Sequence, residues 1–211
     1  MERKQASAHL TYAQRVNNTN WELRQFEIFA HKWIDKSQPD YGVALLNDCK
    51  YGHYVKGNIL DINLLRSPSW PDPTADRAEH EFTYALYPHP GNHIESPVTR
   101  VDYELNVPLK YLVTDSHHGK LKANWSFVKS SVKNVIVDVL KQGEDGKNIV
   151  VRMYETDGKN AKVTIKLGID IQSVLLTKMM EKTIESIAVS NDENRLNYRP
   201  FEIHTIKIKK T

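Results

Sequence analysis

Short runs that alternate apolar and polar residues recur along the chain, and they predict β-strands. In the first half these runs are Leu23–His31, Val43–Leu46, Ile59–Leu65, Glu79–Tyr87 and Val98–Asn106. The alternation in Glu79–Tyr87 predicts a half-buried strand whose apolar face holds His80, Phe82, Tyr84 and Leu86. Ser67–Ala78 contains three prolines and several turn-forming residues, which predict a long irregular loop.

The second half consists of shorter strand-like runs at regular spacing. They are Val132–Lys141, Asn148–Glu155, Ala161–Leu167, Val174–Thr177, Thr183–Val189 and Phe201–Lys209. Asp145-Gly146 and Asp157-Gly158 are tight-turn dipeptides, and only Leu176–Lys182 has a helical alternative. The polar segment Asp115–Lys120 marks a domain boundary. We therefore predict an all-β protein with domains at residues 1–114 and 115–211, the second an antiparallel sandwich.

Composition narrows the possible partners and location. The hydrophobic content of 40% and charged content of 26% are ordinary for a globular protein. A net charge of +3 is spread along the chain without a basic stripe, so no nucleic-acid partner is expected. The sequence has no signal pattern and no long apolar run, which predicts a cytoplasmic protein without a membrane partner. The single cysteine, Cys49, excludes an internal disulfide.

Three residue pairs imitate the spacing of an active or metal site: Glu79 with Glu81, His89 with His93, and Cys49 with His53. Ordinary structural roles are favoured for each: carboxylates on the solvated face of a strand, histidines in a turn, and a small packed cysteine. Zinc normally needs three or four protein ligands, and no set of that size is evident. From the residues alone, the chain lacks a self-sufficient catalytic or metal-binding group.

The loop after Val43–Leu46 carries the remaining candidates. Asn47, Asp48, Lys50 and Tyr51 offer an amide, a carboxylate, an ammonium group and an aromatic ring. Such groups bind sugar hydroxyls and stack on a pyranose face. They are equally consistent with a charged hairpin turn in which Asp48 and Lys50 pair at the surface, so the residues alone leave both interpretations open.

Several sequence blocks together resemble the C-terminal β region of glycoside hydrolase family 38 α-mannosidases. The blocks are Ala30–Trp33, Gly42–Asp48, Lys50–Gly52, Leu64–Pro68, Pro71–Pro73 and His80–His89, with weaker likeness at Asn18–Trp21 and Arg199–Ile203. The resemblance runs from about Asn18 to Lys207 and is stronger in the first half. It implies part of a galactose-mutarotase-like β-supersandwich followed by a smaller Ig-like β-sandwich.

The resemblance also implies a function. Family members hydrolyse terminal α-mannosides with retention, using a zinc ion and an aspartate nucleophile in an N-terminal barrel. Nothing in this sequence resembles that barrel, so the chain is expected to be a scaffold and pocket wall for a separate catalytic region, and inactive alone. Zinc is expected in the catalytic region and no cofactor in this chain. The alternative is a free-standing carbohydrate-binding or protein-interaction module, because β-sandwiches often serve that purpose.

By resemblance, the loop lies near the mannose pocket, and this assigns its residues. Lys50 is expected to contact substrate, Asp48 to orient Lys50, and Tyr51 to flank them. Cys49 loses its candidacy as a nucleophile, because the family performs its chemistry elsewhere. We expect no catalytic or metal-binding residue in this chain.

Overall fold

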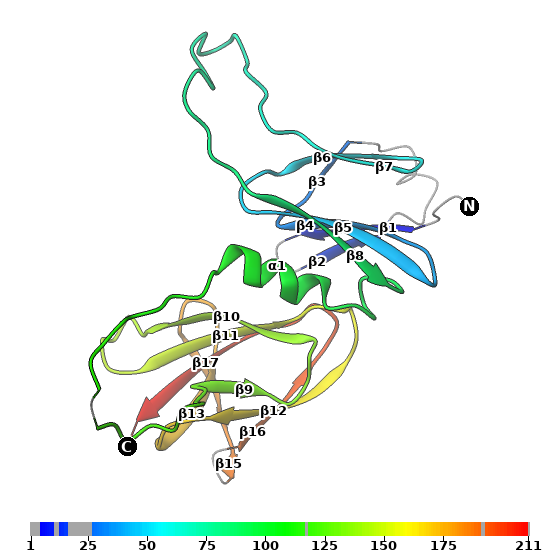
Figure 1. Ribbon diagram of the computed structural model, residues 1–211. Coiled ribbons are helices and arrows are strands. Elements are labelled where there is room, and N and C mark those ends of the chain that lie inside the picture. Colours follow the sequence, from blue (N-terminus) through cyan, green and yellow to red (C-terminus); the bar gives the residue numbers. More distant parts are fainter. Residues whose placement is uncertain (1–4, 11–12, 17–26, 117, 191–192, 211) are drawn as a thin grey trace. The chain divides into compact units, whose positions relative to one another are not determined.

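A computed structural model describes residues 5–10, 13–16, 27–116, 118–190 and 193–210, with side chains from residue 27 onward except 189, 190 and 193. The chain divides into two compact units, residues 1–112 and 113–211 (Figure 1). Each contains two antiparallel sheets, which confirms the all-β class. The Asn18–Trp21 motif and the first residues of Leu23–His31 lie outside the described residues. The described part holds no helix that could cross a membrane.

The first unit contains a five-stranded and a three-stranded sheet. The larger has the order β2(Ala13–Val16), β1(Gln5–Leu10), β4(Trp33–Ser37), β5(Tyr41–Asn47), β8(Tyr84–Pro90). The smaller has the order β3(Glu27–Phe29), β6(Gly52–Lys56), β7(Ile59–Ile62). The predicted strands at Val43–Leu46 and Ile59–Leu65 are thus present as β5 and β7.

Strand β4 lies in the middle of this unit, and all five of its residues are buried. Residues that alternate along a strand point to opposite faces of the sheet, so β4 has two packing partners. Ile34 packs in a cluster with Leu45 of β5 and Val55 of β6, which joins the two sheets. Trp33 packs on the other face with Leu46, beneath the helix α1. The larger sheet is therefore covered on both faces.

The predicted strand at Val98–Asn106 is wrong, because the segment forms the helix α1(Val98–Asn106). Val98, Val101, Asp102 and Leu105 follow the i, i+3, i+4, i+7 spacing of one helix face. Val98 and Asp102 are fully buried, and Val101 and Leu105 pack against the Trp33 cluster. Val101 and Leu105 fit both periods, but Val98 shares a face with them only in a helix, and packing against the sheet selects the helix.

The predicted strand at Glu79–Tyr87 is also corrected. The strand β8 starts at Tyr84 and continues through Pro90, and its exposed face includes Tyr84 (56%) and Leu86 (68%). The inward face instead ends in His89, which is buried. A proline cannot donate to a sheet hydrogen bond, but β8 is an edge strand, so Pro88 and Pro90 are tolerated.

The second unit is a sandwich of a five-stranded and a four-stranded sheet. The first has the order β10(Val135–Gln142), β11(Ile149–Glu155), β17(Ile203–Lys210), β13(Ile171–Thr177), β14(Thr183–Ile187). The second has the order β15(Val189–Ser190), β16(Glu193–Tyr198), β12(Ala161–Leu167), β9(Val128–Ser130). Their inward-facing residues form one apolar core, which includes Met153, Ile165 and Ile206.

Turns in this unit follow the local sequence. Gly146 and Gly158 have φ values of +69° and +70°, as expected for tight-turn glycines. The helical alternative for Leu176–Lys182 is wrong, because Leu176 pairs with Ile206 in the sheet. The chain then turns, and the Lys178 N–H donates to the Lys182 carbonyl at 2.8 Å. Pairing with β17 therefore outweighs any local helical preference.

Candidate functional site

Asn47 fixes the start of the loop that the sequence singles out. Its side chain is buried, its Oδ1 accepts from the Lys50 N–H at 2.7 Å, and its Nδ2 donates to the Lys32 carbonyl at 3.2 Å. The Asn47 N–H donates to the same Lys32 carbonyl at 2.7 Å. A buried asparagine that bonds two backbone segments locks a turn, so Asn47 positions the loop.

Helix α1 supports the loop from the other side. Asn106 Nδ2 donates to the Asn47 carbonyl at 3.2 Å and to the Asp102 carbonyl at 3.0 Å. The Lys32 ammonium lies 3.3 Å from the centre of the Tyr103 ring, within the range of a cation–π contact. The loop thus rests on a helix and two strands, and these elements are buried against each other.

Asp48 is exposed and contacts the chain entering β8. The Asp48 N–H donates to the Thr83 carbonyl at 3.2 Å, and Asp48 Oδ2 accepts from the Thr83 N–H at 3.0 Å. Hydrogen bonds from the Cys49 thiol and from Thr83 lower the pKa of Asp48, and the same carboxylate raises the pKa of Cys49. Asp48 is therefore ionised at neutral pH and holds Thr83.

Lys50 is partly buried and lies over Phe82, the residue that precedes Thr83. Its ammonium is 5.0 Å from the centre of the Phe82 ring. Within the described part of the chain, Asp48 and Lys50 form no ion pair. The surface-pair interpretation is therefore not what the structure shows, and both side chains contact residues just before β8.

Tyr51 belongs to an aromatic group with Phe29 and His31. The His31 ring centre lies 4.7 Å from that of Tyr51 and 4.7 Å from that of Phe29. Phe29 and Tyr51 are about half exposed. Tyr51 therefore packs with rings beside the three-stranded sheet, whereas Asp48 and Lys50 contact residues just before β8. The three candidate residues lie in two different environments.

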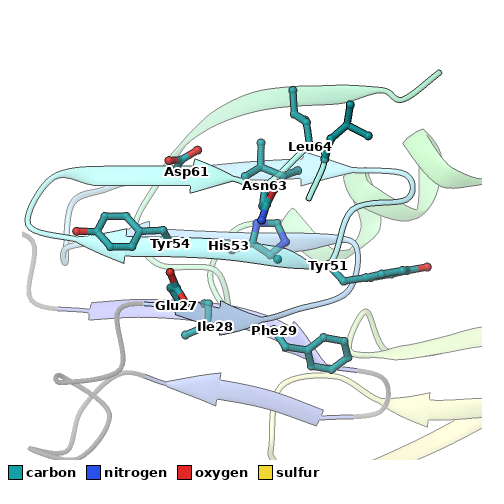
Figure 2. Close-up of a pocket in the computed structure, with 12 residues that line it drawn as sticks. Glu27, Ile28, Phe29, Tyr51, His53, Tyr54, Asp61, Asn63 and Leu64 are labelled. Carbon is teal, nitrogen blue, oxygen red and sulfur yellow. The ribbon is translucent and has the colours of Figure 1, made fainter. Parts of the chain in front are cut away.

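That sheet carries a groove of about 880 Å³ next to the loop. Figure 2 shows Glu27, Tyr54 and Asp61 on three adjacent strands, and the strand register places them directly opposite one another. Gly52 has no side chain, and its would-be Cβ lies 3.3 Å from Cβ of Asn63. Gly52 thus leaves a hollow in the sheet surface between Asn63 and the aromatic group.

The groove combines acidic, amide and aromatic groups. Glu27 and Asp61 supply carboxylates, Asn63 an amide, and Phe29 and Tyr51 ring faces. Carboxylates and amides hydrogen-bond to hydroxyls, and a ring face packs on apolar C–H groups. The sequence does not reveal this set, because only the register of three strands brings the residues together. The alternation in β6 and β7 is the one signal that these side chains share the outer face.

The three residue pairs that imitate the spacing of an active or metal site do not form such a site among the described residues. Glu79 and Glu81 are exposed, Cys49 is exposed rather than packed, and His53 is buried. His89 is not in a turn but in β8, where its Nε2 lies 2.7 Å from Asp35 Oδ2 in a fully buried pair. His93 is also buried, and burial, with the neighbouring His89, lowers its pKa to about 4. No group of three metal-ligating side chains occurs among the described residues.

Family models match both units in order. "Glycosyl hydrolases family 38 C-terminal domain" matches residues 3–74, and "Glycosyl hydrolases family 38 C-terminal beta sandwich domain" matches residues 134–206. The chain belongs to the C-terminal β region of this family. Between the two matched stretches lie β8, α1 and β9.

Relatives and solved structures agree with this assignment. The chain is 38% identical over 191 residues to human "Alpha-mannosidase 2C1". The aligned residues make up 88% of this chain and 18% of the relative. The chain is 36% identical over 200 residues to "Alpha-mannosidase G" of Dictyostelium discoideum, covering 90% and 18%. An alpha-mannosidase structure from Enterococcus faecalis V583 has a TM-score of 0.77 at 19% identity, covering 99% of this chain and 24% of that one, and it supports the fold. The chain spans about a fifth of the length of these curated relatives.

Proposed function

We propose that this chain forms the C-terminal β scaffold and one pocket wall of a zinc-dependent, retaining α-mannosidase. The observation that carries the proposal is the ordered match of both units to the C-terminal models of family 38. The relatives that match about nine-tenths of the chain are named alpha-mannosidases. In this proposal the zinc ion and the nucleophile belong to another region, and the complete enzyme works in the cytoplasm.

In this proposal each of the three loop residues has a different role. Lys50 contributes a positive charge that contacts the mannoside, and Tyr51 flanks the sugar. Asp48 acts indirectly, through Thr83. Its two hydrogen bonds to Thr83 place Phe82 beneath the Lys50 ammonium. An ammonium group donates hydrogen bonds to sugar hydroxyls, but it supplies neither a nucleophile nor a metal.

Two assays test this proposal. The purified chain with zinc should not hydrolyse an aryl α-mannoside, and reproducible turnover would refute its role as a scaffold. In an enzyme completed with the missing family 38 region, Lys50→Ala should lower kcat/KM about tenfold, which is about 1.4 kcal/mol. Lys110→Ala, at an exposed lysine outside the loop, is the control and should change nothing.

The groove on the three-stranded sheet favours a second candidate function, carbohydrate binding by the chain itself. Calorimetric titration with mannose and mannobiose distinguishes it from the scaffold function. Saturable heat that Phe29→Ala removes supports a binding module, since Phe29 is the exposed ring beside Gly52. The absence of heat leaves the scaffold function as the sole candidate.

A further inference from the structure

The segment of residues 63–83, here called the arm, leaves the two sheets between β7 and β8 (Figure 1). It contains no strand or helix, and from Leu65 to Glu81 every residue except Pro68 and Ala75 is exposed. Loops this long without secondary structure are uncommon in a compact domain, and they are usually functional or linker segments. The arm is not a linker between domains, because it begins and ends in the same unit.

The arm is locally ordered. Asp72 Oδ1 accepts from the Thr74 N–H at 2.8 Å and from its hydroxyl at 2.7 Å. Asp76 Oδ2 accepts from the Ser67 N–H at 2.8 Å, and the Asp76 carbonyl lies 2.9 Å from His80 Nε2. The bond between Ser67 and Asp76 joins residues nine positions apart and the other contacts fix shorter turns, so the arm holds a shape of its own.

The base of the arm is fastened at both ends. The Asn63 N–H donates to the Gly52 carbonyl at 2.8 Å where the arm leaves β7. Where it returns to β8, Asp48 holds Thr83 through two hydrogen bonds. The candidate loop therefore fixes the direction in which the arm projects.

Trp70 lies in the arm between Ser67 and Asp76, which are hydrogen-bonded to each other, and 83% of its surface is exposed. Tryptophan carries a large apolar surface, and it is enriched among the residues that dominate the binding energy of protein interfaces. Arg66, Asp72 and Arg77 are exposed residues of the same arm, and such polar side chains suit the rim of an interface. An ordered projection with one exposed indole has the composition of a docking element.

We propose that the arm docks, through Trp70, onto the part of a family 38 polypeptide that this chain does not span. The inference rests on the proposed scaffold function and adds the element that makes the contact. The length of the relatives argues for this occupant, because about four-fifths of each lies outside the match. The Enterococcus faecalis structure points the same way, since 99% of this chain matches only 24% of that larger chain.

The test measures binding between this chain and the segment of human Alpha-mannosidase 2C1 that lies outside the match, by biolayer interferometry. Trp70→Ala should weaken binding at least tenfold, and Trp70→Phe should weaken it less. Tyr111→Ala removes another exposed ring, outside the arm, and should leave the affinity unchanged. Because Trp70 is exposed, its replacement should not unfold the chain, and an unchanged circular dichroism spectrum checks this.

The outcomes separate the two proposals. No binding by the unaltered chain would overturn both the scaffold function and the docking arm. Equal binding by the unaltered chain and Trp70→Ala would overturn the arm alone. Sedimentation that shows self-association lost in Trp70→Ala would assign the arm to a second copy, and mannobiose binding lost in that variant would assign it to a sugar. Either result would overturn the proposed partner.

Discussion

Asp102 offers a sharp test of how helix α1 supports the candidate loop. It lies on the buried face of α1 and is itself fully buried, and neither carboxylate oxygen accepts a hydrogen bond from the described residues. Burial raises the pKa of Asp102 to about 7, although the charge of Lys32 and the Asn106 amide oppose the shift. The perturbation is Asp102→Asn, which keeps the shape of the side chain and removes its charge.

The expected change in the free energy of unfolding follows from the shift in the pKa of Asp102. An unfolded aspartate has a pKa of about 3.9, so the folded chain binds an extra proton between about pH 4 and pH 7. A raised carboxyl pKa means that stability is complete below the unfolded value and is lost as pH rises toward 7. Three pKa units at about 1.36 kcal/mol each correspond to about 4 kcal/mol of lost stability. Asp102→Asn should therefore match the unaltered chain near pH 4 and exceed it by up to about 4 kcal/mol at pH 8.

Urea unfolding at pH 4, 6 and 8 measures this difference. Fluorescence of Trp33, which is buried near α1, reports on the first unit when the other three tryptophans are replaced by phenylalanine. Glu104→Gln removes an exposed carboxylate from the same helix and should show no such trend. Parallel pH profiles for Asp102→Asn and the unaltered chain would refute the reasoning, because Asp102 would then be charged without cost.

Three further variants test other contacts. Glu155 is buried and accepts five hydrogen bonds, four of them from backbone N–H groups, so Glu155→Ala should cost about 4 kcal/mol in thermal unfolding of the second unit. Gly42→Ala places a methyl group against the His89 ring and should cost about 1–3 kcal/mol in urea unfolding of the first unit. Asp48→Ala removes the acceptor of the Thr83 N–H and should speed hydrogen exchange there about fivefold, for a loss of about 1 kcal/mol.

Each variant has a matched control elsewhere in the chain. Glu185→Ala removes an exposed glutamate from the same unit as Glu155. Gly119→Ala adds a methyl group where nothing lies within 4 Å. Asp40→Ala removes an exposed aspartate from another turn. A variant that behaves like its control shows that the corresponding contact contributes nothing measurable.

Local patterns predicted much of this fold. Strand β12 alternates buried and exposed residues over Ala161–Leu167, and the Asp-Gly turns lie where the dipeptides predict them. The errors have a common cause. Val101, Tyr103 and Leu105 alternate as in a strand, whereas Val98, Val101 and Leu105 share one face of a helix. The face that β8 buries depends on the strand and helix that pack against it. Tertiary packing, which lies outside any local window, settles both.

The candidate site, too, was predicted only in part by local sequence patterns. Motif blocks pointed to Asp48, Lys50 and Tyr51 as one loop, but the residues that they contact lie far away in sequence. Asp48 bonds to Thr83 across 35 positions, and the groove depends on the register of three strands. No pattern within the loop indicates that Asp48 and Lys50 contact the end of the arm.

The most direct test of the central claim is an activity reconstitution. The part of human Alpha-mannosidase 2C1 outside the match is assayed on an aryl α-mannoside, with zinc, before and after addition of this chain. The scaffold function predicts no turnover from either piece alone and clear turnover from the mixture. Turnover by this chain alone, or a mixture no more active than its pieces, would contradict it.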